Sequence, residues 1–232
     1  MLGFSPDEWT AIMLSLRVAT VGTLFGLPVA LFLAYILARW RFPGKVVLDG
    51  VLHLPLVMPP VVTGYFLLLT FGRQGAIGNA FYEMFGITFA FRWTGAALAC
   101  GIMGFPLMLR AIRLSFEAVD RRLETAAATL GANALWTFLI VTLPLALPGI
   151  LAGVVLCFAK ALGEFGATIT FVSNIPGETQ TIPSAIYTYT QVPGGDYQAL
   201  RLACVSIAIA MIALIVSEVL NRRIQKRIAV FE

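Results

Sequence analysis

Long runs without a charged side chain most constrain what this chain can fold into. Residues 18–38 carry no charge, and a helix over them is long enough to cross the hydrocarbon core of a bilayer, which is about 30 Å thick. Further apolar runs follow at residues 50–72, 93–109, 140–159 and 202–217. Because lipid offers no hydrogen-bond partner to an open backbone, each run is expected to be helical. We therefore predict an all-α integral membrane protein with about five transmembrane helices.

The composition favours the same class of protein. Only 12% of the 232 residues are charged, whereas soluble domains carry about 25%. The length suits a single transmembrane domain over residues 1–232. The basic residues do not cluster as a nucleic-acid-binding stripe requires, so no nucleic-acid partner is expected. Cys100, Cys157 and Cys204 lie in apolar runs without close spacing, which predicts buried free thiols and no metal site.

The basic residues orient the predicted spans. Eleven of the sixteen lysines and arginines fall on one side of the membrane, and the other five fall on the opposite side. Because cytoplasmic loops carry the excess of basic residues, we expect the N-terminus outside and the C-terminus in the cytoplasm. Arg17 directly precedes the first uncharged run and is expected to lie at the outer headgroups.

Residues 117–143 combine charge, helix formers and a central glycine on the predicted cytoplasmic side. Ala126 and Ala127 belong to a run of strong helix formers. Gly131 then offers a position where the backbone turns sharply without a Cβ penalty. An apolar run follows, which includes Leu135, Trp136 and Phe138 and ends at Leu143 and Pro144. We predict two short protruding helices joined at Gly131, with an ordinary helical loop as the alternative.

Three prolines interrupt the second apolar run. Pro55, Pro59 and Pro60 each lack a backbone donor, so this helix is expected to be broken or kinked. A broken helix at membrane depth persists where protein or a water-filled cavity satisfies its free carbonyls, which indicates the wall or gate of a pathway. A packing kink without a transport role is the alternative. His53 follows Asp49 by four residues, a spacing that favours a local ion pair over a proton relay.

An outer segment at about residues 163–200 is rich in small and hydroxyl-bearing residues. Pro183 is expected to lead a helix over residues 184–191. The uncharged run 165–177 is too short to cross the membrane. The segment suggests a lid over a pore mouth or a docking surface, with a plain loop as the alternative. Its pathway candidates are Glu164, Phe165, Thr168 and Thr170, and its docking candidates are Asn174, Pro176, Gly177, Thr181 and Tyr187.

The cytoplasmic segment resembles the coupling loop of ABC-importer permeases. That loop contains Glu-Ala-Ala, three residues, Gly, nine residues and Ile-x-Leu-Pro, which Ala126, Ala127, Gly131 and residues 141–144 match in spacing. The acidic residue here is Glu124, one position early, and Thr125 occupies the usual position of the glutamate. The resemblance implies a coupling helix that sits in a groove of a separate ATPase. The residues assigned to it are Glu124, Ala126, Ala127, Gly131, Leu135, Trp136, Phe138, Leu143 and Pro144.

Longer strings are similar to the molybdate-transport permeases. They include residues 52–60, 164–168 and 173–179, and the similarity extends from about residue 10 to residue 220. The resemblance implies the type I ABC importer permease fold in a prokaryotic inner membrane. It also implies two permease copies, two ATPase subunits that use ATP and Mg, and an external binding protein that delivers molybdate or tungstate.

No set of residues for catalysis is visible in the sequence. The chain has one histidine, no Cys–His pairing and no phosphate-binding glycine loop, so it is expected to bind no cofactor and to leave ATP hydrolysis to a partner. Three alternatives stay open. They are a permease for another oxyanion such as sulfate, a secondary transporter that works without ATP, and a membrane enzyme, for which no cluster of His, Asp or Glu is visible.

Overall fold

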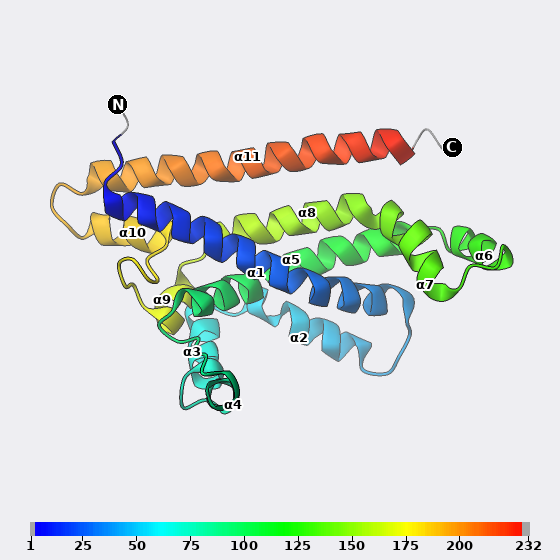
Figure 1. Ribbon diagram of the computed structural model, residues 1–232, viewed down its shortest axis with the longest axis horizontal. Helices are drawn as coiled ribbons and strands as arrows, with labels where there is room; N and C mark the ends of the chain where they lie inside the picture. Colours follow the sequence, from blue (N-terminus) through cyan, green and yellow to red (C-terminus); the bar gives the residue numbers. More distant parts are fainter. Residues whose placement is uncertain (1–2, 229–232) are drawn as a thin grey trace.

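The computed structural model describes residues 3–228, and every regular element within them is a helix (Figure 1). Four helical stretches are long and apolar enough to cross a membrane. They are α1 (Pro6–Arg39), α5 (Trp93–Ala118), the continuous stretch Ala134–Leu162 that ends with α8 (Leu143–Leu162), and residues Asp196–Arg223 of α11 (Asp196–Ile228). The helices α2 (Lys45–Val57) and α3 (Pro60–Phe71) are together also long and apolar enough to form one broken span. The prediction of an all-α chain with about five spans is confirmed.

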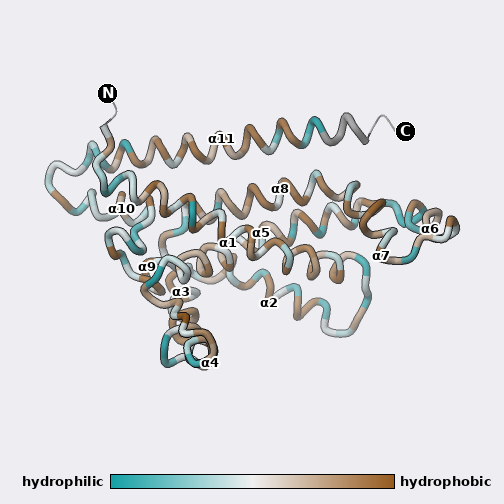
Figure 2. Tube along the Cα trace, in the orientation of Figure 1, coloured by the Kyte–Doolittle hydropathy of each residue, from teal (hydrophilic) through white to brown (hydrophobic). Residues whose placement is uncertain are grey.

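The long helices pack side by side, with α5 between α1 and α8 (Figure 1). Small residues allow the close crossings. A Cβ added at Gly22 of α1 would lie 2.5 Å from the carbonyl oxygen of Ala97 in α5. One added at Gly153 of α8 would lie 3.0 Å from the carbonyl oxygen of Met108, also in α5. Glycines at these two positions therefore let the backbones of α1 and α8 approach α5 closely. Figure 2 shows hydrophobic residues along the length of these helices.

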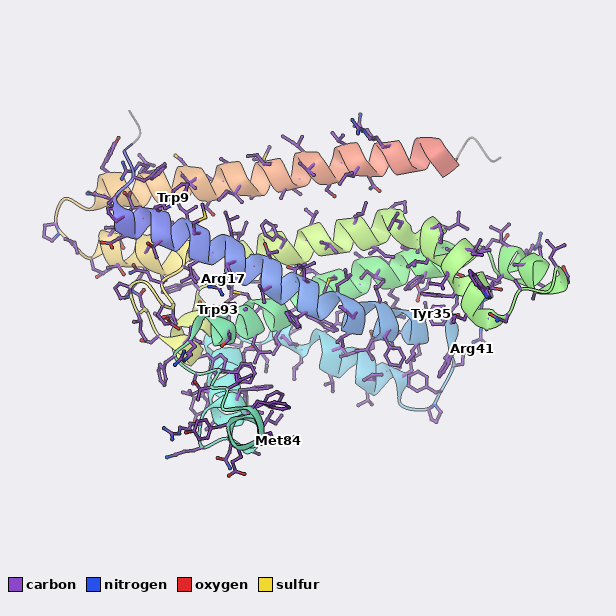
Figure 3. The ribbon with its side chains drawn as sticks, viewed as in Figure 1. Trp9, Arg17, Tyr35, Arg41, Met84 and Trp93 are labelled. Carbon is purple, nitrogen blue, oxygen red and sulfur yellow. The ribbon has the colours of Figure 1, made fainter. Side chains whose placement is uncertain are left out.

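α1 begins well before the uncharged run at residue 18. Ser5 and Glu8 form a reciprocal capping box at its start, and Pro6 occupies the first turn. Arg17 lies within the helix, where its guanidinium stacks 3.6 Å above the ring of Trp93 (Figure 3). The uncharged run therefore predicted too short a helix. Arg17 is accommodated within α1 because the neighbouring helix α5 supplies an aromatic face for its positive charge.

The second span is broken, as the prolines predict. α2 and α3 meet at an angle of 113°, with extended backbone at Met58 and Pro59, and Pro60 begins α3. Pro55 lies inside α2 and does not cause the break. α3 projects away from the long helices toward α4 (Ala76–Phe85), which the sequence did not predict (Figure 1).

Two groups of short helices lie at opposite ends of the long ones (Figure 1). One end carries α6 (Arg121–Thr129), α7 (Ala134–Thr137) and the π-helix η1 (Phe138–Thr142), and α11 runs toward this same end. The other end carries α9 (Gly166–Val172), α10 (Ile182–Thr190) and the start of α1. The predicted helix led by Pro183 is confirmed as α10. The predicted separation of residues 117–143 from residues 163–200 is also confirmed.

The three cysteines are unpaired, but they are not all buried. Cys100 and Cys157 lie in the core as predicted. Cys204 is exposed on α11, so the prediction of burial was wrong for this residue. An apolar stretch alone did not show which face of α11 packs against α8 and α10.

Candidate functional site

A helical hairpin protrudes at one end of the molecule. We use the term hairpin for residues 121–137, which comprise α6, the turn at Gly131 and α7. Gly131 has a φ of +89°, a left-handed conformation that residues with a Cβ rarely adopt. Asn133 caps α7, where its side chain accepts a 2.9 Å hydrogen bond from the backbone N–H of Trp136. The predicted geometry of two short helices joined at a glycine is confirmed.

Large apolar side chains on the hairpin are exposed. The exposed fractions are 89% for Leu130, 66% for Leu135 and 56% for Trp136. Ala126 is also exposed, whereas Ala127 is half-buried. The resemblance assigned Leu135 and Trp136 to the coupling helix, whereas Leu130 was not among the assigned residues. Exposed apolar groups that gather on a protruding element indicate a surface for a partner protein.

Phe138 does not belong to this exposed surface. Its ring centroid lies 5.0 Å from that of Tyr35 and 6.0 Å from that of Phe116, in an aromatic cluster between α1, α5 and η1. The half-buried ring of Phe138 therefore packs within its own chain, and its assigned contact to an ATPase stays a prediction. Leu143 packs beside the same core, and Pro144 is exposed at the first turn of α8.

The carboxylate of Glu124 also points toward its own subunit. Its Oε1 accepts a 2.7 Å hydrogen bond from the guanidinium of Arg39 and a 2.7 Å hydrogen bond from the hydroxyl of Thr142. The resemblance placed Glu124 among the residues that couple to an ATPase. The structure instead shows intrachain partners that lie 85 and 18 positions away in the sequence.

The two sets of pathway candidates come together at the other end. A Cβ added at Gly166, which begins α9, would lie 2.7 Å from Cβ of Pro60, which begins α3. A Cβ added at Gly64 would lie 2.5 Å from the carbonyl oxygen of Ala167. The break after Pro59 is thus packed directly against α9. Pro55 lies before the break and stays apart from this contact.

The polar pathway candidates on α9 already have partners. Glu164 is buried and accepts hydrogen bonds from Lys160 Nζ (2.8 Å) and from the backbone N–H of Ala167 (3.0 Å). The hydroxyls of Thr168 and Thr170 donate to backbone carbonyls of their own helix turn. These groups stabilise the start of α9. The Thr63 hydroxyl on α3, which the sequence did not single out, is buried without a hydrogen-bond partner in the described part of the chain.

The docking candidates divide into exposed and buried residues. Pro176, Gly177 and Tyr187 are exposed. Thr181 is buried before α10, so it cannot serve as an outer contact and this prediction was wrong. Asn174 is half-buried and donates a 2.7 Å hydrogen bond from Nδ2 to the hydroxyl of Thr188. The exposed part of this segment therefore includes Ser173, residues 175–177 and Tyr187. The ring of Phe165, a pathway candidate, lies against that of Tyr187, with 5.3 Å between the centroids.

His53 takes part in a local polar cluster. Its Nδ1 lies 2.8 Å from the backbone oxygen of Asp49, and the Asp49 carboxylate accepts a 2.9 Å hydrogen bond from Arg113. The imidazole of His53 also lies 3.5 Å from the Asp49 carboxylate, so the expected proximity of these two side chains is confirmed, with Arg113 as a further partner. Within residues 3–228, no group of three or more His, Cys, Asp or Glu side chains lies close enough to hold a metal ion.

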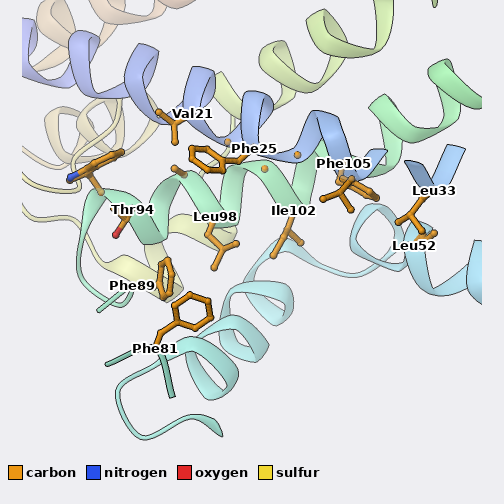
Figure 4. A pocket seen from close by; sticks show the side chains of 16 residues that line it. Val21, Phe25, Leu33, Leu52, Phe81, Phe89, Thr94, Leu98, Ile102 and Phe105 are labelled. Atoms are coloured by element: carbon orange, nitrogen blue, oxygen red, sulfur yellow. The ribbon is translucent and has the colours of Figure 1, made fainter. Parts of the chain in front are cut away.

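An apolar cavity of about 740 Å³ lies along α1 and α5 (Figure 4). Its wall includes Val21 and Phe25 of α1, Leu98 and Ile102 of α5, and Phe81 of α4. The side chain of Thr94 contributes the one hydroxyl among the residues that line it. An unpaired dianion loses its hydration without compensation in such surroundings, so this cavity is unsuited to hold an oxyanion.

Comparison with known proteins identifies relatives of this chain. Residues 26–226 match the model of the binding-protein-dependent transport system inner membrane component family. The chain is 60% identical over 220 residues to the molybdenum transport system permease protein ModB of Escherichia coli strain K12, which covers 95% of this chain and 96% of the relative. It is 55% identical to the ModB protein of Haemophilus influenzae, over 95% of this chain and 96% of the relative.

More distant relatives extend the same picture. The sulfate transport system permease protein CysT of Salmonella typhimurium is 33% identical, over 97% of this chain and 80% of the relative. The structure of a bacterial alginate ABC transporter in complex with an alginate pentasaccharide-bound periplasmic protein matches with a TM-score of 0.75. That match has 17% identity and covers 96% of this chain and 81% of that chain. The MetNI methionine ABC transporter matches with a TM-score of 0.66 and 12% identity over 94% of each chain.

The two structural matches show a shared fold and nothing more specific, because their identities are low. The predicted type I ABC importer permease fold is thereby confirmed. The match over most of the chain, together with identities of 55% and 60% over nearly full lengths, shows the family directly. This chain belongs to the family of binding-protein-dependent transport system inner membrane components.

Proposed function

We propose that this chain is the membrane-spanning subunit of an ATP-driven importer that moves molybdate into the cytoplasm by alternating access. The observation that carries this proposal is the 60% identity to a molybdenum transport permease over nearly the full length of both chains. Identity to a sulfate permease is 33%, so molybdate is favoured over sulfate as the cargo. Tungstate is included in the proposal because it is also a tetrahedral dianion.

The hairpin is proposed to dock on a separate ATPase subunit. The exposure of Leu130, Leu135 and Trp136 supports this, since such side chains are costly to leave in water on a protruding element. In this scheme the ATPase binds ATP and Mg, and the chain itself binds no cofactor. The end that carries the hairpin then faces the cytoplasm, and the end that carries α9 and α10 faces outward, in agreement with the bias of basic residues.

The outer end is proposed to receive a binding protein loaded with molybdate. Pro176, Gly177 and Tyr187 are exposed there and provide contacts that do not depend on charge. Two copies of the chain are proposed to enclose the pathway. Closure of two ATPases by ATP moves the two hairpins together and opens the pathway outward, and hydrolysis restores the inward-facing state. A ligand drives such a change only by binding one state more tightly than the other.

The proposal is tested by purifying the tagged chain with the products of neighbouring genes and reconstituting the complex in liposomes. We expect a soluble ATPase to copurify, and ATP hydrolysis to rise when the binding protein and molybdate are added. Sulfate and phosphate at equal concentration serve as controls. Stimulation by sulfate instead of molybdate would reassign the cargo. Uptake that proceeds without ATP would favour a secondary transporter.

A further inference from the structure

Three polar side chains meet at the base of the hairpin. They are Arg39 at the end of α1, Glu124 in the first turns of α6 and Thr142 at the end of η1. The guanidinium of Arg39 and the hydroxyl of Thr142 each donate a 2.7 Å hydrogen bond to the same Oε1 of Glu124. We call these three residues the clamp. Hydrogen bonds to a charged acceptor are stronger than those between neutral groups.

The clamp is largely removed from solvent. The side chains of Arg39 and Glu124 are 8% and 22% exposed, and Thr142 is 1% exposed. Further hydrogen bonds surround it, because Arg39 donates to the carbonyl of Val119 (3.3 Å) and Arg121 donates to the carbonyl of Arg39 (3.4 Å). The ends of α1 and α5 are thus joined to α6 by side chains.

Packing alone does not hold α6 in place. The helix has no buried residue, and the elements that it contacts most are α7 and η1. A helix with so little apolar burial is displaced from the rest of the fold at a low cost in free energy. The clamp therefore supplies the main attachment of α6 to a transmembrane helix.

We propose that Arg39, Glu124 and Thr142 position the hairpin so that its displacement is transmitted to α1 and, through η1, to α8. This inference rests on the proposed docking of an ATPase at the hairpin. It adds two positioning residues, Arg39 and Thr142, and it assigns the Glu124 carboxylate to a contact within the subunit. Thr142 ends a π-helical turn, and such turns are frequent at functional sites in helices.

The test measures molybdate taken up per ATP hydrolysed by the full complex in liposomes, together with the amount of ATPase that copurifies. We expect Arg39→Ala and Glu124→Ala each to lower uptake per ATP about tenfold, since each removes a charge-assisted contact and leaves a largely buried charge without its oppositely charged partner. The double variant is expected to fall no further than the worse single variant, because both changes break one unit. Thr142→Val is expected to lower the ratio about threefold.

Arg41→Ala is the matched control. Arg41 lies two residues after Arg39 and is exposed, so its removal changes the net charge on this side of the membrane by the same amount. We expect uptake per ATP within twofold of that of the unmodified complex. A purely structural role of the clamp would reduce the yield of assembled complex while the ratio in the surviving complex stayed unchanged.

Two results would overturn the proposed role of the clamp. The first is an unchanged uptake per ATP in both single variants. The second is a fall in uptake per ATP in the double variant equal to the product of the two single falls. If the Arg39→Ala complex fails to assemble, Thr142→Val provides the test, because it removes one hydroxyl at nearly constant shape. An unchanged uptake per ATP in that variant then refutes the proposed role of the clamp. An unmodified complex without molybdate-dependent ATP hydrolysis would instead refute the proposed function.

Discussion

The contact between α3 and α9 allows a sharp prediction for Gly64→Ala. The new methyl group would lie 2.5 Å from the carbonyl oxygen of Ala167 and 2.9 Å from both its Cα and the Cβ of Thr170. Ordinary van der Waals contact begins near 3.4 Å, so the helices must separate by roughly 0.9 Å. Two of the opposing atoms belong to the backbone and cannot rotate away.

Overpacking of this kind costs about 2 kcal/mol of stability. For a chain of this size, that loss corresponds to a fall in melting temperature of about 4–8 °C. The assay is the apparent melting temperature of the purified protein in detergent, at one scan rate for all variants. We also expect lower uptake in the reconstituted complex, because the same displacement separates Pro60 from Gly166.

Gly50→Ala is the control, since it introduces the same methyl group into α2 with no heavy atom within 4 Å. Alanine is the better helix former by about 1 kcal/mol, so this variant should melt at the same temperature as the unmodified protein or above it. Equal melting temperatures for Gly64→Ala and Gly50→Ala would refute the conclusion that α3 is fixed by backbone contact with α9.

Three further predictions concern the end of the molecule that carries the hairpin. Gly131→Val should strain the turn by about 1–3 kcal/mol, because φ is +89° while no atom crowds the site; ATPase copurification should fall and membrane insertion should not, and unchanged copurification would contradict it. Trp136→Ala should leave the melting temperature within about 2 °C but weaken ATPase binding at least tenfold in a titration, as expected for an exposed aromatic anchor. Phe138→Ala should lower the melting temperature and leave ATPase binding nearly unchanged, because about 3 kcal/mol of stability is lost from the cluster with Tyr35 and Phe116. Equal melting temperatures for Phe138→Ala and Trp136→Ala would refute the difference between the two sites.

Features that depend on local covalent chemistry followed from the sequence. The break between α2 and α3 comes from Pro59 and Pro60, which lack backbone donors wherever they lie. The turn at Gly131 and the start of α10 near Pro183 have similarly local causes. The four long apolar helices were predictable because a long uncharged run in lipid must satisfy its own backbone hydrogen bonds, which a helix does.

Features that depend on distant partners required the tertiary structure. Arg17 is accommodated within α1 because Trp93 of α5 lies against it. α1 also starts at Pro6, where Glu8 pairs with Arg201, almost two hundred positions away. No local pattern shows which of several carboxylates will meet a given arginine.

The hairpin and the π-helix η1 that follows it illustrate this division most directly. The two helices of the hairpin and its glycine turn follow from residue types and their spacing. The exposure of Leu135 and Trp136, which share an apolar run with the packed Phe138, required the tertiary structure. The direction of the Glu124 carboxylate, toward Arg39 and Thr142, was decided by the packing of α1, α6 and η1. Backbone conformation is largely set by neighbouring residues, whereas the partner of a charged side chain is set by whichever element the fold brings beside it.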